Sequence, residues 1–417
     1  MAEKIESVSL KFLGTAFIFA IALFAFACSS SDPEVVEVIK EVEVVKEVEV
    51  EKEVVKEVEV EKEVVKEVEV VKEVEVVKEV EVVKEVEKEV IKEVVVAAPE
   101  KEKREIVFSG LGWDSALLQN AVARYVVENG YGYPTSEIEG QTVPLFQGLR
   151  KGDVDLAMEI WLPNQNVVWQ EAVRAGEVLP VGKSLEDNWQ STFLIPKYIQ
   201  DANPDLDSVE DLKEDKYKAL FAEPDSGGKA VLWGCIATWA CRGVQEGTEA
   251  GPGQLEAYGL TDHVELRDPG TAGALAAAVE GAFKKGDAIM FYYWGPTKLM
   301  HDLSGQYVDL EQPDPSTCTG NDPVHGCAFP AAEVMIAMNT NLVDDAPELI
   351  PFFRSWDWSA GNQLVAETWL GENKDNYSSS AEGFAATAVW YLKNNDAWKA
   401  WLPSDVLAKV EKALAAE

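Results

Sequence analysis

The chain has 417 residues, a formal net charge of −37 at pH 7 and 13 Trp, all at or after Trp113. Such an acidic chain argues against nucleic acid as a partner, because phosphate contacts require Lys and Arg, and against unassisted docking on anionic lipid. The composition changes near Pro99, where a stretch of Val, Glu and Lys ends. We therefore expect a stalk followed by a folded unit of about 300 residues, long enough for one large domain or two lobes.

The N-terminus has the pattern of an export signal. Residues 12–27 are almost wholly apolar, and this run is shorter than the roughly 20 residues of a bilayer-spanning helix but typical of a signal-peptide core. It ends in Ala-Phe-Ala-Cys28-Ser, which resembles a bacterial lipoprotein cleavage site. We therefore expect a signal peptide at 1–27 and a lipidated N-terminus at 28–33. The domain would then lie outside the cytoplasm, tethered to the membrane by a lipid anchor on Cys28; an uncleaved N-terminal anchor is the alternative.

Residues 34–99 form a degenerate repeat of Val, Glu and Lys with units such as EVEVEKEVVK. The repeat shows neither a sustained heptad nor clean alternation, so it predicts no single regular structure. We interpret the segment as a spacer that lifts the folded unit off the membrane. A helical, oligomeric stalk is the alternative.

The folded unit opens with the pattern of an α/β lobe. Ile106–Phe108 is predicted to be a buried strand, followed by a glycine-containing loop with Trp113 and a helix over 116–128. Ligands in doubly wound sheets bind beyond the carboxyl ends of the strands, which is where Trp113 falls. The loop lacks the GxGxxG spacing, so a dinucleotide site is not supported.

Two further segments place a Trp at the carboxyl end of a predicted strand. Residues 154–161 are predicted to form a strand that ends in Trp161, with Glu159 on the same face because side chains two apart share a face. Residues 288–294 form another that ends in Trp294.

The remaining apolar runs suggest how the lobes connect. The run at 193–196 is interpreted as the crossing into a second lobe, and 334–338 as a strand that returns to the first. We expect two doubly wound α/β lobes joined by a hinge, with the first lobe at 104–195, the second at 196–332 and the return to the first at 333–417.

Four cysteines remain after Cys28 is set aside. They are Cys235, Cys241, Cys318 and Cys327, and an even number in an exported chain predicts disulfides. Four cysteines allow three pairings, of which the local one closes two short loops; buried free thiols are the alternative. Neither pair has the two-residue spacing of common zinc sites. The shorter loop contains Trp239.

The tryptophans in these motifs suggest a binding site. Several indole rings in one pocket can hold a quaternary ammonium without a formal countercharge, because each ring face is negative. His263, His301 and His325 lie in loop-like contexts without a Ser/His/Asp order, metal cluster or phosphate loop around them. We therefore expect a binding protein that uses no metal or cofactor and is not an enzyme.

The motifs Gly112-Trp113, GDVDLAMEIWLP, CIATWAC and FYYWGP occur in this order. Together they resemble the substrate-binding proteins of glycine betaine/proline betaine ABC importers. The resemblance implies the type II periplasmic-binding-protein fold, in which two α/β lobes close on the ligand, and an ABC permease as partner. It implies that Trp161, Trp239 and Trp294 are three cage tryptophans. Trp113 matches a Trp of the choline-binding branch and would be the fourth.

The resemblance also assigns polar neighbours to the ligand. The periplasmic betaine binders place a His four residues after the first cage Trp, and this chain has Gln165 there. The backbone N–H groups of Ala240 and Cys241 would complete the site for a ligand carboxylate. Glycine betaine or proline betaine is therefore the expected ligand.

Other positions keep other ligands open. The choline branch has an acid where this chain has Ser115, with Asp114 adjacent. Glu159 is placed to contact a hydroxyl or a protonated amine oxide. The alternatives are thus a binding protein for choline, carnitine or trimethylamine N-oxide, or the ligand-sensing ectodomain of a signalling system.

Overall fold

The computed structural model describes residues 103–249, 251–314 and 326–417. The predicted signal peptide, the lipidated segment with Cys28, the stalk and Cys318 lie outside these residues. Within them, no helix is both long enough and apolar enough to cross a bilayer.

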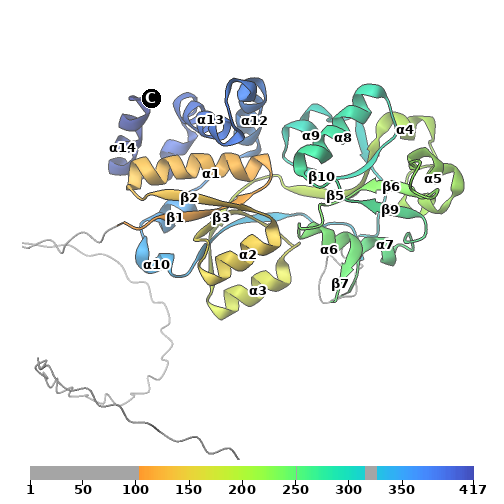
Figure 1. Ribbon diagram of the computed structural model, residues 1–417, viewed down its shortest axis with the longest axis horizontal. Coiled ribbons are helices and arrows are strands. Elements are labelled where there is room, and N and C mark those ends of the chain that lie inside the picture. Colours follow the sequence, from red (N-terminus) through yellow and green to blue (C-terminus); the bar gives the residue numbers. More distant parts are fainter. Residues whose placement is uncertain (1–102, 250, 315–325) are drawn as a thin grey trace, which may run out of the picture. The chain divides into compact units, whose positions relative to one another are not determined.

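Two five-stranded sheets form the framework of the folded unit (Figure 1). The first sheet has the order β2–β1–β3–β12–β4. Its strands are β1 (Ile106–Leu111), β2 (Thr135–Gly140), β3 (Leu156–Leu162), β4 (Val178–Lys183) and β12 (Glu333–Asn339). β1 runs parallel to β2 and β3, whereas β12 runs antiparallel to both β3 and β4. The last strand in sequence therefore lies inside the first sheet.

Helices cover both faces of the first sheet. Helix α1 (Asp114–Val126) lies on one face with α12 and α13, and α2 and α3 lie on the other (Figure 1). The predicted helix over 116–128 corresponds to α1 and the π-helical turn η1 (Val127–Tyr131). The remaining elements of this part are α2 (Thr142–Lys151), α3 (Asn166–Ala175), α10 (Leu342–Asp345), α11 (Leu349–Arg354), α12 (Ala360–Asn373), η4 (Lys374–Asn376), α13 (Ser380–Asn394), η5 (Ala397–Trp401) and α14 (Ser404–Leu414).

The second sheet has the order β11–β5–β10–β6–β9. Its strands are β5 (Trp189–Pro196), β6 (Ala230–Trp233), β9 (Val264–Arg267), β10 (Met290–Gly295) and β11 (Tyr307–Asp309). Strand β5 is antiparallel to β10 and β11, and β6 is parallel to β10 and β9. The accompanying elements are α4 (Lys197–Ala202), η2 (Val209–Lys213), α5 (Asp215–Phe221), α6 (Cys241–Glu246), β7 (Gly247–Thr248), β8 (Gly251–Pro252), α7 (Gln254–Ala257), α8 (Ala272–Lys285) and α9 (Lys298–Asp302). These two helix-flanked sheets confirm the predicted α/β fold class.

The chain crosses between the sheets earlier than the sequence predicts. β4 belongs to the first sheet and β5 to the second, so the crossing lies between Lys183 and Trp189 rather than at the predicted boundary after residue 195. The apolar run at 193–196 is the buried end of β5, paired on both sides, and not a linker. A central strand buried on both faces reads as a continuous apolar run, which a sequence pattern cannot distinguish from an apolar crossing.

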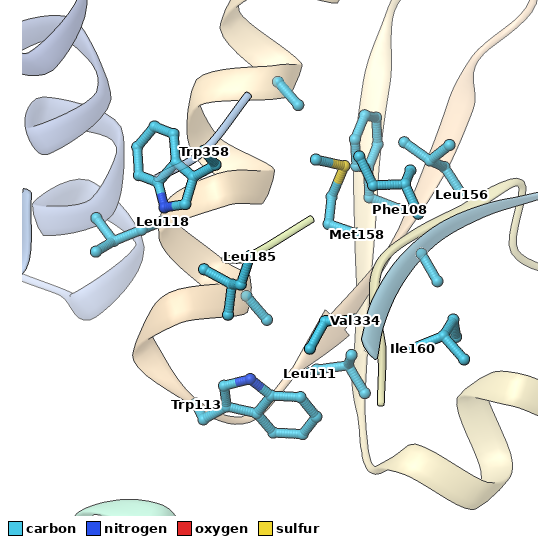
Figure 2. Packing of buried hydrophobic residues seen from close by; sticks show 14 of the residues in the cluster. Phe108, Leu111, Trp113, Leu118, Leu156, Met158, Ile160, Leu185, Val334 and Trp358 are labelled. Atoms are coloured by element: carbon cyan, nitrogen blue, oxygen red, sulfur yellow. The ribbon is translucent and has the colours of Figure 1, made fainter. Parts of the chain in front are cut away.

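A buried core joins the first sheet to α1 and to the C-terminal helices. Figure 2 shows Leu118 of α1 beside Trp358, and Phe108 beside Leu156, the latter pair from neighbouring strands. All four side chains are fully buried. Trp113 lies at the edge of this core, where β1 gives way to α1 (Figure 2). The core therefore fixes the helix that this tryptophan directly precedes.

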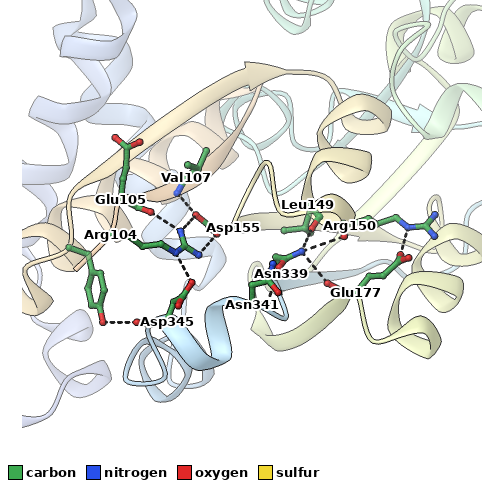
Figure 3. A network of polar contacts seen from close by, with 11 residues as sticks. Arg104, Glu105, Val107, Leu149, Arg150, Asp155, Glu177, Asn339, Asn341 and Asp345 are labelled. Atoms are coloured by element: carbon green, nitrogen blue, oxygen red, sulfur yellow. Dashed lines mark hydrogen bonds and ion pairs between the residues drawn. The ribbon is translucent and has the colours of Figure 1, made fainter. Parts of the chain in front are cut away.

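A polar network fastens the amino end of β1. The guanidinium of Arg104 donates two hydrogen bonds to the buried carboxylate of Asp155 and one to Asp345, while Asp155 also accepts from the backbone N–H of Val107 (Figure 3). These bonds, mainly those to Asp155, raise the pKa of Arg104, which keeps it charged. Asn339 donates to the carbonyl of Leu149 and ties β12 to α2. The network lies at the amino end of β3, opposite Trp161.

Candidate functional site

Four tryptophans line one cavity. Trp113, Trp161, Trp239 and Trp294 are each 6–7% exposed. The rings of Trp113 and Trp239 meet edge to face with centroids 5.1 Å apart, and those of Trp239 and Trp294 do so at 5.3 Å. The cavity is open at its mouth, and the empty space between its walls, part of it open to solvent, is about 340 Å³. We refer to it as the tryptophan cavity, and its lining comprises Trp113, Thr142, Trp161, Asn164, Gln165, Gln190, Trp239, Ala240, Cys241, Tyr292 and Trp294.

Each ring is placed by the end of a regular element. Trp113 follows β1 and precedes the first residue of α1, and Trp161 and Trp294 lie near the carboxyl ends of β3 and β10. Trp239 lies in the loop closed by the disulfide between Cys235 and Cys241, just before α6. The carboxyl ends of strands thus direct three rings to one place, and a covalent loop holds the fourth.

The cavity is assembled from both sheets. Trp113 and Trp161 belong to the part built on the first sheet, and Trp239 and Trp294 to the part built on the second. The indole N–H of Trp239 donates to the side-chain oxygen of Gln141, which precedes α2, at 2.6 Å. The ring contact between Trp113 and Trp239 also joins the two parts. The structure therefore shows the two lobes closed on each other.

Uncharged polar groups complete the lining. Gln165 is 5% exposed, and no hydrogen bond within the described part of the chain engages its side-chain amide. In the same ranges, the backbone N–H groups of Ala240 and Cys241 donate to no backbone carbonyl. These three predicted residues therefore present free donors beside the tryptophans.

A second polar group of the lining is already paired. The side-chain oxygen of Gln190 accepts from the Asn164 amide at 2.8 Å and from the Tyr292 hydroxyl at 2.9 Å. Burial raises the pKa of Tyr292, so its hydroxyl remains a neutral donor. Because Asn164 follows β3 whereas Gln190 and Tyr292 lie on β5 and β10, this triad also connects the lobes.

Glu159 does not line the tryptophan cavity, although it was predicted to face the ligand. It is 1% exposed, and its carboxylate accepts from the indole N–H groups of Trp113 at 2.7 Å and Trp161 at 2.9 Å. The amide of Gln119 donates to its other oxygen at 2.8 Å. Glu159 therefore holds two of the rings from behind.

Asp114 and Ser115 line a second cavity on the far side of Trp113 and Trp294, not the tryptophan cavity. The second cavity is acidic and also contains Glu367, 8% exposed, whose carboxylate accepts the backbone N–H of Lys298 at 2.5 Å. Desolvation raises the pKa of Asp114 and brings that of Glu367 to about 7. Asp114 and Ser115 begin α1 directly after Trp113. Their side chains lie along the second cavity, whereas the Trp113 ring lines both cavities.

Thr142, Asn164, Gln190 and Tyr292 were not predicted from the sequence. Tyr292 carried a usable signal, because it stands two residues before Trp294 and therefore shares its face of β10. Asn164 is adjacent to Gln165. Thr142 and Gln190 come from segments with no distinguishing pattern, and only the packing of the lobes brings them to the cavity.

One of the predicted disulfides is present in the structure. Cys235 and Cys241 form a disulfide, and Cys327 is also disulfide-bonded; Cys318 lies outside the described residues. In the ranges that the structure describes, no group of three or more His, Cys, Asp or Glu side chains is placed to hold a metal ion.

Comparisons with known proteins agree in family and fold. The family model described as the substrate binding domain of ABC-type glycine betaine transport system matches residues 104–387. The chain is 23% identical over 302 residues to the trimethylamine N-oxide-binding protein of Pelagibacter ubique (strain HTCC1062), covering 71% of this chain and 90% of that protein. It is 27% identical over 158 residues to the glycine betaine/proline betaine-binding periplasmic protein of Escherichia coli (strain K12), covering 38% of this chain and 45% of that protein.

The fold is also similar to that of a solved binding protein. The glycine/betaine/L-proline-binding protein from Borrelia burgdorferi superposes with a TM-score of 0.57 at 19% identity, over 73% of this chain and 99% of that chain. At this identity the similarity shows the fold, which is that of the type II periplasmic binding proteins.

Proposed function

Because the chain belongs to the family of substrate-binding domains of ABC-type glycine betaine transport systems, we propose that its tryptophan cavity captures glycine betaine or proline betaine. Proteins of this family bind solutes for ABC transporters and are not enzymes. The chain is accordingly the substrate-binding component of a betaine- or choline-type ABC transporter. The proposal concerns which ligand it holds and how.

The observation that carries the proposal is the chemistry of the lining. Four indoles surround the cavity, and none of the described residues that line it carries a formal charge. A primary ammonium needs hydrogen-bond acceptors around all of its N–H groups, which ring faces supply poorly. A quaternary ammonium has no N–H and is attracted to the ring faces, each contributing on the order of 1–2 kcal/mol when desolvated. The lining therefore favours a methylated cation.

The free donors favour a ligand that also carries a carboxylate. The amide of Gln165 and the N–H groups of Ala240 and Cys241 lie along the same cavity without protein acceptors in the described ranges. Buried donors left unpaired cost stability, and a carboxylate would satisfy them. Glycine betaine and proline betaine combine both groups. Carnitine, choline and trimethylamine N-oxide remain the alternative ligands.

The closed arrangement fits delivery to a transporter. The ligand would hold the lobes together through contacts to rings from both sheets, and an ABC permease would receive the closed form. The alternative partner is a signalling system that uses the same unit as a sensor. An extracytoplasmic location for this chain is consistent with the name of its E. coli relative, which describes that protein as periplasmic.

Membrane attachment would come from the N-terminal segment. We propose that residues 1–27 direct export and that Cys28 carries lipid, leaving the repeat at 34–99 as a spacer. Cys28→Ala should move the protein from the membrane fraction to the soluble extracytoplasmic fraction. Retention of Cys28→Ala in the membrane would favour an uncleaved anchor instead.

Isothermal titration against glycine betaine, proline betaine, choline, carnitine and trimethylamine N-oxide tests the proposal. We expect saturable one-to-one binding, tightest for a betaine, without turnover of the ligand. Tightest binding of choline or trimethylamine N-oxide would reassign the ligand. No binding of any of the five would refute a methylated-ammonium function.

A further inference from the structure

The buried carboxylate of Glu159 lies directly behind two rings of the tryptophan cavity. One of its oxygens accepts both indole N–H groups, from Trp113 at 2.7 Å and from Trp161 at 2.9 Å. The side chain is 1% exposed and does not reach the cavity itself. A carboxylate in this position touches the rings but not a ligand.

The hydrogen bonds around Glu159 favour its ionised form. A protonated acid would need an acceptor for its own O–H, yet the partners that hold this carboxyl group all donate to it. The nearest amide oxygen, on Gln119, already accepts from Ser184 at 2.8 Å and from the Trp356 indole at 3.0 Å. Burial is the largest influence and raises the pKa of Glu159, and the hydrogen bonds from Trp113, Trp161 and Gln119 offset part of that rise. The indole and amide donors therefore suit the anion, and the hydroxyl of Ser115, which has no hydrogen-bond partner within the described residues, is the neighbouring group able to accept from a protonated acid.

We propose that Glu159 is ionised and serves as the countercharge of the tryptophan cavity, selecting a cationic group over a neutral one of the same shape. This inference rests on the proposed function, since it concerns how the same cavity recognises its ligand. The lining itself contains no formal charge among the described residues, so a compensating charge has to come from behind the rings, where the Glu159 carboxylate touches two of them.

Two effects follow from this arrangement. An indole that donates its N–H to an anion is polarised toward its ring, which strengthens the attraction of the ring face for a cation. The negative charge also attracts the ligand cation directly across a dry, low-dielectric wall, where Coulomb interactions exceed those in water. Keeping the carboxylate out of contact prevents it from holding primary ammonium or metal ions by direct coordination.

The test compares a cation with its neutral-carbon isostere. Glycine betaine and 3,3-dimethylbutanoate both carry a carboxylate, but the second replaces the quaternary nitrogen with carbon. We expect Glu159→Gln to weaken glycine betaine on the order of tenfold or more, and to change 3,3-dimethylbutanoate by less than threefold. Equal losses for both ligands, or no loss for either, would overturn the proposal.

Two further variants separate charge from packing. Gln119→Met removes a donor from the same network without changing its charge, so it should weaken both ligands equally. Glu159→Asp keeps the charge on a shorter side chain, so the preference for glycine betaine over the isostere should persist even if both affinities fall. Loss of that preference in Glu159→Asp would show that the hydrogen-bond geometry, not the charge, provides selectivity.

An infrared comparison of the ligand-free wild type with Glu159→Gln tests the charge independently of the ligand. The variant should lose carboxylate stretching intensity, with no change in the carbonyl band of protonated acids. Loss of an acid carbonyl band would show that Glu159 is neutral and would overturn the proposal. Failure of all five methylated ligands to bind would instead refute the proposed function and would leave this infrared result standing.

Discussion

The indole N–H of Trp239, on the second lobe, donates a 2.6 Å hydrogen bond to the side-chain oxygen of Gln141, on the first. Trp239 also contacts the rings of Trp113 and Trp294, one from each lobe. A single side chain therefore takes part in the ring cluster and in a cross-lobe hydrogen bond. Contacts of this kind link ligand capture to lobe closure.

Removing the acceptor should loosen the closed form. Gln141→Met leaves the Trp239 N–H without its partner, and a neutral hydrogen bond contributes roughly 1 kcal/mol. We expect three- to tenfold weaker ligand binding, mainly through faster dissociation. Stopped-flow fluorescence of the tryptophans measures both rates. Gln147→Met is the control, because Gln147 lies in α2, the helix that Gln141 precedes, and its side chain makes no hydrogen bond in the described part of the chain. This variant should bind like the wild type, and an equal effect of the two changes would argue against a cross-lobe role.

The disulfide between Cys235 and Cys241 should matter for affinity as well as for stability. Closing so short a loop contributes roughly 2 kcal/mol to stability in the chain-entropy model, and this loop carries Trp239 and Ala240. Replacing both cysteines by Ser should lower the melting temperature and weaken binding severalfold. Calorimetry and titration measure the two effects.

The predicted pair of Cys318 and Cys327 provides the control. Cys327 is disulfide-bonded but does not line the tryptophan cavity. Serine at Cys318 and Cys327 should therefore lower stability without weakening ligand binding. Equal losses of affinity in the two double variants would contradict a specific role for the loop around Trp239.

The stability of the closed form should depend on Glu367. Burial raises its folded-state pKa from 4.5 to about 7, with nearby Asp114 and Glu159 adding to the shift. A raised carboxyl pKa means that the folded state binds a proton that the unfolded state releases, between pH 4.5 and about 7. The contribution to stability is therefore fully present below about pH 4.5, declines between pH 4.5 and about 7, and is lost once the pH has risen through about 7.

We expect the wild type to lose roughly 2 kcal/mol more stability than Glu367→Gln between about pH 5.5 and about pH 8. Urea unfolding at the two pH values measures the difference, and subtracting the variant removes the effect of the other acidic groups. Parallel pH profiles for the two proteins would show that Glu367 titrates normally.

Local pattern was sufficient to predict the tryptophans. A Trp at the carboxyl end of a strand points to the sheet edge where α/β lobes bind ligands, and this holds for Trp161 on β3 and Trp294 on β10. The disulfide loop with Trp239 was one of the three pairings that the sequence left open, and the structure shows it. The crossing between the sheets was misplaced because a buried strand and an apolar linker have the same composition.

The polar residues were harder to predict, for physical reasons. Alternation correctly places Glu159 and Trp161 on one face of β3, but it carries no information about depth, and the carboxylate lies beneath the ring. Gln190 reaches the cavity only because the second lobe closes against Asn164. Such contacts depend on how the two lobes pack, which no local periodicity encodes.

The most direct test of the account is the affinity of Trp239→Ala for the best ligand of the panel, measured by titration. Removing this ring should weaken binding by far more than tenfold, roughly 2 kcal/mol or more. Trp369→Ala is the control, because Trp369 stacks on Trp390 with centroids 5.2 Å apart and does not line the tryptophan cavity. A loss below threefold for Trp239→Ala would show that the tryptophan cavity is not the binding site.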